Sequence, residues 1–139
     1  RAMVASMHLA DATRQHTLAA QAARDKLEEL QDADFAQLFV LYGSGTAPGP
    51  DFAVEGLTSA SDDEDGLCGE IEFPSTDGQL LEKLARPELG MPRDLDGSGD
   101  LDEDDHALDY ALLPVRILVR WRTDGGPSQV EVKRFLAAR

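Results

Sequence analysis

The first 42 residues carry the pattern of a long amphipathic helix. They contain neither Gly nor Pro, and ten of them are Ala, a composition that strongly favours helix. Within residues 17–31, small and apolar side chains recur at spacings of three and four and form one stripe: Ala19, Ala20, Ala23, Leu27 and Leu30. A continuous helix of this length spans roughly 60 Å at about 1.5 Å per residue. We therefore expect part of it to project from the domain or to lie against another chain.

The stripe loses its phase at residues 31–34, which predicts a break in the helix near 32–34. Asp34 precedes Gln37 by three residues, a spacing that resembles a capping box. A second, short helix is expected at residues 35–41 and to end at residues 42–43. Four apolar side chains would dock it on the core: Phe35, Leu38, Phe39 and Leu41.

The C-terminal third shows the alternation of β-strands. Residues 110–122 place Val115, Ile117, Val119 and Trp121 on one face and three arginines on the other. Residues 123–128 have turn composition and residues 129–136 form a return strand. Pro114 is expected at a strand start or a sheet edge, because it has no N–H to donate.

The middle of the chain is turn-rich and predicts shorter elements. Residues 68–73 alternate as a strand with Ile71 and Phe73 inward, residues 52–54 favour a short strand, and residues 79–85 favour a single helical turn. The prediction is one α+β domain over residues 1–139, a long N-terminal helix on a small antiparallel sheet. Its parts are the helix at 1–42, variable loops and short strands at 43–109, and a C-terminal β-hairpin at 110–139.

Composition and charge argue against several classes of function. The chain has 13 Lys and Arg against 27 Asp and Glu, a net charge of −14, which argues against a nucleic-acid partner because phosphate contacts require clustered cations. No apolar run reaches the roughly 18 residues of a membrane span. The single cysteine, Cys68, excludes an internal disulfide and a cysteine-rich zinc site, and we expect it to be a buried thiol. No nucleophile–base set is visible, so an enzyme is not expected.

Residues 94–105, called the acidic loop below, have the spacing of a twelve-residue calcium loop. Such loops place oxygen ligands at positions one, three, five, seven, nine and twelve and a glycine at six. Gly99 occupies position six, and Leu101 at position eight is expected to anchor the loop in the core. The candidate ligands for Ca²⁺, with Asp100 acting through its backbone carbonyl, are Asp94, Asp96, Ser98, Asp100, Asp102 and Asp105.

Two departures from a helix–loop–helix site stand out in the acidic loop. Ser98 is a weaker ligand than Asp or Asn, and Gly90 and Pro92 disfavour an entering helix. Eight acids lie between residues 94 and 109, and a bound dication would offset their mutual repulsion. A solvated acidic loop and a magnesium or other ion remain the alternatives.

Weaker signals have ordinary interpretations. Asp62, Asp63, Glu64 and Asp65 are expected to be a solvated loop tip, with an additional ion as the alternative. His106 is expected at the surface. The arginine face made by Arg116, Arg120 and Arg122 is expected to pair with acids of the sheet, with a polar ligand-binding face as the alternative.

The order of elements resembles that of type IV pilin-like proteins, in particular minor pilins and type II secretion pseudopilins. The resemblance covers the helical segment QAARDKLEELQ at residues 21–31 and the terminal sheet from LLPVRILVRWR to QVEVKRFLAAR. The family's exposed half of the N-terminal helix corresponds here to Ala20, Arg24, Lys26, Leu27, Glu28, Glu29 and Leu30.

The resemblance implies a structural subunit of a type IV pilus or a type II secretion filament. It implies other pilin or pseudopilin subunits as partners through the N-terminal helix, and anchoring in the inner membrane by an apolar segment upstream of Arg1. The location would be the cell envelope. It also agrees with calcium near the terminal sheet, a feature of some pseudopilins. The alternative function is a calcium-stabilised extracellular adhesion or protein-binding module.

Overall fold

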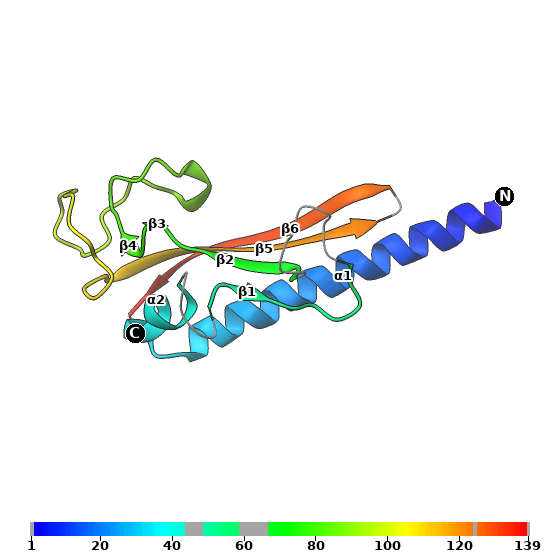
Figure 1. Ribbon diagram of the computed structural model, residues 1–139, viewed down its shortest axis with the longest axis horizontal. Helices are drawn as coiled ribbons and strands as arrows, with labels where there is room; N and C mark the ends of the chain where they lie inside the picture. Colours follow the sequence, from blue (N-terminus) through cyan, green and yellow to red (C-terminus); the bar gives the residue numbers. More distant parts are fainter. Residues whose placement is uncertain (1, 44–48, 59–66, 124, 139) are drawn as a thin grey trace.

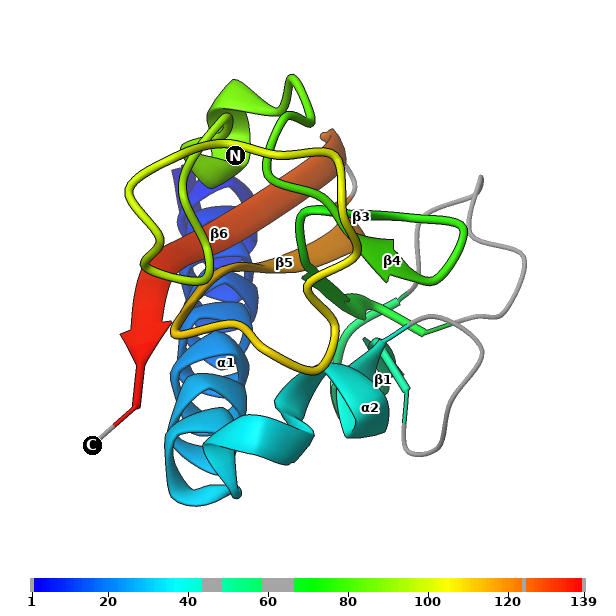
Figure 2. The same cartoon turned by 90° about the vertical axis from the view of Figure 1, so that its left-hand side faces the viewer.

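The structure of the chain is a computed structural model, and it describes residues 2–43, 49–58, 67–123 and 125–138, with side chains from residue 10 onward. It is an α+β fold in which an N-terminal helix lies along an antiparallel sheet (Figures 1 and 2). This coarse class confirms the prediction made from the sequence. No helix within the described ranges combines the length and hydropathy that crossing a membrane requires.

Helix α1 spans Ala2–Asp32 and packs on the sheet through the predicted stripe. Ala19, Ala23 and Leu30 are fully buried and Leu27 is nearly so. The small alanines allow the helix backbone to approach the two long C-terminal strands, β5 (Leu112–Thr123) and β6 (Gly126–Ala137), closely. The side chains of residues 10–14, 16 and 17 are exposed, and the N-terminal turns extend beyond the end of the sheet (Figure 1).

The helix breaks where its stripe loses phase. Asp34 has an extended backbone and its carboxylate accepts a hydrogen bond from the Ala36 N–H, which begins the 3₁₀ helix η1, Phe35–Gln37. The short helix α2, Leu38–Tyr42, follows directly. Leu38 and Phe39 are buried in the core, with Phe35 and Leu41 packed against it. The expected second helix is therefore confirmed, with its first turn tightened to 3₁₀ geometry.

The main sheet has four antiparallel strands in the order β1-β2-β5-β6. Strand β1 is Asp51–Phe52, β2 is Gly69–Glu72, β5 is Leu112–Thr123 and β6 is Gly126–Ala137. The face toward α1 carries the buried side chains of Ile71, Val115, Ile117, Val119 and Trp121. The predicted hairpin is confirmed, but its turn is shorter than the expected 123–128, because Thr123 pairs with Gly126 and residues 126–128 belong to β6. The strand expected at 52–54 lies at Asp51–Phe52. Pro114 lies beyond the part of β5 that pairs with β2.

The opposite face of the sheet carries the arginines. Arg116 donates to Glu131 at 2.7 Å and to Glu72 at 3.2 Å, and Arg120 donates to Glu70 at 3.4 Å. These contacts support the expectation that the arginine face pairs with acids of neighbouring strands.

One local prediction is wrong. The expected helical turn at residues 79–85 is instead a small hairpin, in which β3, Ser75–Thr76, pairs with β4, Gln79–Leu80. Asp77 and Gly78 form its two-residue turn with φ of 53° and 79°, the left-handed geometry that Asp-Gly turns adopt. A further 3₁₀ helix, η2, covers Pro87–Leu89 and ends at Gly90, so the residues before the acidic loop do not form an entering α-helix.

Candidate metal-binding loop

The acidic loop lies at the end of the molecule opposite the N-terminus (Figure 1). Its two tight turns fall at Gly97 and Gly99, where φ is 76° and 90°. The Asp94 carboxylate fixes both turns, because it accepts hydrogen bonds from the Gly97 N–H at 3.1 Å and the Gly99 N–H at 2.8 Å. Glycine is favoured at these two positions because other residues rarely adopt positive φ.

Asp96 lies beside Asp94 at the start of the loop. Its pKa is lowered first by the hydrogen bond from the Ser98 backbone N–H, whose nitrogen lies 3.1 Å from Oδ1. Hydrogen bonding with the Asp94 carboxyl and with the Ser98 hydroxyl adds to this effect. Two neighbouring carboxylates at a loop start form an arrangement that a cation would stabilise.

Ser98 and Asp100 form the exposed tip of the loop. The Ser98 hydroxyl donates to the Asp100 carbonyl at 3.1 Å and accepts from the Asp100 N–H at 3.3 Å. The carbonyl that position seven would offer to an ion is thus already hydrogen-bonded in this geometry.

The remaining two candidate ligands hold the C-terminal part of the loop. Asp102 Oδ1 lies 2.7 Å from His106 Nε2 and accepts the Asp104 N–H at 3.0 Å. Asp105 Oδ1 accepts the N–H groups of Leu80 in β4 at 3.0 Å and of Ala107 at 2.9 Å. The structure therefore places Asp94 beside Asp96, brings Asp96 and Asp102 to His106, and directs Asp105 toward strand β4.

The apolar anchor of the loop differs from the expected residue. Leu101 is 42% exposed, whereas Leu95 is fully buried. The Leu95 carbonyl also accepts the N–H groups of Ala111 and Leu112, at 2.7 and 3.0 Å. The loop is consequently joined to the core at its second position and to the start of β5, rather than at its eighth position.

His106 is buried, which corrects the expectation of a surface residue. Only 2% of it is exposed, and both ring nitrogens face acids. Nδ1 lies 2.9 Å from Asp109 and 3.7 Å from Asp96, while Nε2 lies 2.7 Å from Asp102 and 3.3 Å from Glu82. Burial lowers the pKa of His106, but hydrogen bonds to Asp102 and Asp109 and the Glu82 charge outweigh burial and raise it to about 9. The ring is therefore an imidazolium at neutral pH.

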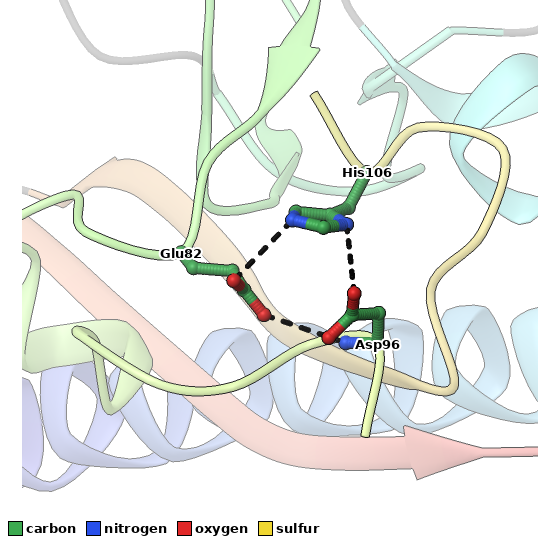
Figure 3. A group of neighbouring side chains, drawn as sticks. All are labelled: Glu82, Asp96 and His106. Atoms are coloured by element: carbon green, nitrogen blue, oxygen red, sulfur yellow. Dashed lines mark hydrogen bonds and ion pairs between the residues drawn. The ribbon is translucent and has the colours of Figure 1, made fainter. Parts of the chain in front are cut away.

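Glu82 is the functional residue that sequence analysis missed. It follows β4, is fully buried, and directs its carboxylate at the acidic loop from outside it (Figure 3). Oε2 accepts the N–H groups of Leu95 at 2.6 Å and Asp96 at 3.5 Å, and Oε1 accepts the N–H of Asp102 at 3.0 Å. No local pattern marks this glutamate, because its partners lie 13 to 20 residues later in the chain.

Glu82, Asp96 and His106 together form a group that can hold a metal ion. One ligand atom from each residue lies within 4.8 Å of the others, and Figure 3 shows the three side chains converging from separate segments. A buried set of carboxylate and imidazole groups is a coordination environment that divalent ions use. Glu82 and His106 were not among the predicted ligands, and an ion could use the His106 ring only in its neutral form, because an imidazolium has no free lone pair to donate to a metal.

Two other features noted in the sequence, the acidic run at residues 62–65 and Cys68, are not part of the acidic loop. The acidic run at residues 62–65 falls outside the described residues. Cys68 is buried as expected, and its Sγ lies 3.9 Å from the Leu57 carbonyl.

Comparison of this chain with protein-family models, with curated proteins and with solved structures finds no match. The functional interpretation therefore depends on the residues and contacts described above.

Proposed function

We propose that this chain is a structural subunit, a minor pilin or a pseudopilin, of a type IV pilus or a type II secretion filament, with its acidic loop stabilised by calcium. It has no catalytic role in this proposal. Its partners are other pilin or pseudopilin subunits, reached through the N-terminal helix, and its location is the cell envelope, with an apolar segment upstream of Arg1 in the inner membrane.

The observation that carries this proposal is the position of α1 relative to the sheet. The second half of the helix packs in the domain through Ala19, Ala23 and Leu30, so the helix and the sheet share one hydrophobic core. The N-terminal turns extend past the sheet, and the side chains of residues 10–14 are exposed (Figure 1). A helix that is anchored at one end and uncovered at the other suits packing against neighbouring subunits.

The adhesion-module alternative would be favoured by a helix buried along its whole length. The exposure of residues 10–14 does not meet that condition. The gene region upstream of the codon for Arg1 provides a direct test. A basic leader followed by about 20 apolar residues that begin with Phe supports the filament proposal. A secretory signal with a small-residue cleavage site contradicts it.

Cross-linking in the cell envelope provides the functional test. Cells that express the gene from its own start codon would carry Cys68→Ser together with Arg14→Cys, on the exposed part of α1. The control carries Cys68→Ser with Lys133→Cys, on the sheet. The filament proposal predicts oxidative cross-linking at the helix position to a second subunit. Cross-linking at neither position, or equally at both, contradicts a helix-mediated assembly.

Calcium is supported by the adjacent carboxylates of Asp94 and Asp96 and by the hard oxygen ligands that the loop offers. Thermal unfolding with millimolar calcium and with chelator tests this part. At a hundredfold excess of calcium over Kd, binding adds about 2.7 kcal/mol, or about 8 °C in Tm for a domain of this size.

The matched variants for this test are Asp96→Asn in the acidic loop and Asp11→Asn on the exposed helix surface, which change charge equally. The calcium-dependent rise in Tm should disappear in the first variant and persist in the second. Superimposable transitions of the wild-type chain with calcium and with chelator would refute a calcium site.

A further inference from the structure

The acidic loop lacks the entering helix that normally shapes a calcium loop, so its shape requires another source. Residues 90–93 are not helical, and the loop tip is exposed. The loop nevertheless folds back so that its second, third and ninth positions approach the same buried carboxylate. The contacts around that carboxylate show which residues hold the two ends of the loop together.

We infer that Glu82 and His106, called the buried pair below, position the acidic loop and order it before any ion binds. The Glu82 carboxylate accepts hydrogen bonds from two N–H groups in the first part of the loop, those of Leu95 and Asp96, and from one in its last part, that of Asp102. A single side chain thereby joins residues seven positions apart in the chain and satisfies backbone donors that would otherwise lose hydrogen bonds on burial.

His106, which directly follows the acidic loop, is the second member of the buried pair. Its Nε2 lies 3.3 Å from Glu82 and 2.7 Å from Asp102, so it neutralises the buried glutamate and fixes the carboxylate at position nine. Both members are at least 98% buried, and a buried charge persists only when it is paired and hydrogen-bonded. Each of the two charged side chains can therefore be buried only because the other lies beside it.

The backbone around β4 reinforces the same arrangement. The Glu82 carbonyl accepts the Arg93 N–H at 3.0 Å just before the loop, and the Leu80 carbonyl accepts the His106 N–H at 2.9 Å just after it. The segment from the end of β4 to Glu82 therefore holds both ends of the loop by main-chain contacts, while the Glu82 side chain holds its interior.

Amide hydrogen exchange in chelator tests this positioning role without calcium. In the wild-type chain, the N–H groups of Leu95, Asp96 and Asp102 should exchange slowly. Glu82→Gln keeps the shape of the side chain but replaces one acceptor oxygen with an NH₂ donor, so it should raise exchange at these three positions by about tenfold or more. Glu72→Gln, which removes an equal charge from the sheet, should leave them unchanged.

The outcomes separate clearly. Rapid exchange of the three amides in the wild-type chain would overturn the inference, and so would a uniform rise over the whole chain in Glu82→Gln. The wild-type measurement remains decisive even when the variant does not fold. His106→Gln provides a second variant, which should raise exchange most at Asp102 because it removes the partner of that side chain.

A calcium titration supplies the second readout, and this arm rests on the proposed function. Glu82→Gln leaves all six oxygen ligands expected in the acidic loop in place and changes only the hydrogen bonds that Glu82 accepts from the Leu95, Asp96 and Asp102 backbone, yet it should raise the calcium Kd by about tenfold or more, because the ion must then order the loop. The Glu72→Gln control should keep the wild-type Kd. An unchanged Kd in Glu82→Gln contradicts the inference, whereas slow amides with no calcium binding in the wild type refute only the proposed calcium site.

Discussion

Removing the proton of His106 should weaken the folded state as the pH rises. The imidazolium faces four carboxylates, those of Glu82, Asp96, Asp102 and Asp109. These contacts outweigh burial and raise its pKa from 6.5 to about 9. A neutral ring in the same place would leave the buried Glu82 without its cationic partner.

The sign and size of the effect follow from linkage. Because the folded chain holds this proton more tightly than the unfolded chain, the stabilisation is complete below pH 6.5 and is lost as the pH rises through about 9. A difference of this size in pKa corresponds to about 3 kcal/mol of unfolding free energy. That is a substantial part of the stability of a domain this small.

Urea unfolding from pH 6 to pH 10, in chelator so that no ion contributes, measures the loss directly. The control is His106→Gln, whose unfolding free energy should vary much less over the same range, since all other titrating groups are shared. The difference between the two chains isolates His106. Parallel curves for wild type and variant would refute the assignment of a buried imidazolium, whatever their absolute stabilities.

Two further predictions concern the core. Ala23 is fully buried between α1 and the sheet, so Ala23→Leu should lower the unfolding free energy by about 1–3 kcal/mol through overpacking. The control, Ala12→Leu on the exposed part of the helix, should change the unfolding free energy by less than about 0.5 kcal/mol. Equal effects of the two substitutions in urea unfolding would contradict the packing described. Trp121 is buried and its indole N–H has no hydrogen-bond partner among the described residues. Trp121→Phe should therefore cost no more than about 1 kcal/mol, because it also removes an unsatisfied donor, while Trp121→Leu should cost more. A loss well above about 1 kcal/mol for the phenylalanine variant in the same assay would contradict this prediction.

The parts of the fold that were predictable from the sequence depend on local patterns. The stripe of Ala19, Ala23 and Leu27 and the alternation in residues 115–121 repeat over enough residues to fix both the element and its buried face. The hairpin of β3 and β4 was missed although Asp77 and Gly78 form a favourable turn dipeptide, because its strands of two residues are too short for any alternation to show.

The acidic loop was predictable as a candidate site only in part. Its aspartates are spaced as a local motif, and the turns at Gly97 and Gly99 follow that motif. The burial of His106 and the approach of Glu82 depend on where the β3–β4 hairpin lies in three dimensions. Neither residue has an unusual sequence neighbourhood, so no periodicity distinguishes a buried glutamate from a solvated one at these positions.

The buried pair and the dication of the proposed calcium site would complement each other, because the buried pair leaves Asp94 without a cation. His106 neutralises the C-terminal part of the loop, where it contacts Asp102 and Asp109 at 2.7 and 2.9 Å. At the N-terminal part, no lysine or arginine of the described residues forms an ion pair with Asp94 or Asp96, and the two carboxylates accept hydrogen bonds from the loop backbone. Asp96 lies 3.7 Å from His106, whereas Asp94 has no ion pair among the described residues, so Asp94 is where a dication would add most to stability. The loop is thus built to fold around its own imidazolium while leaving charge for an external ion.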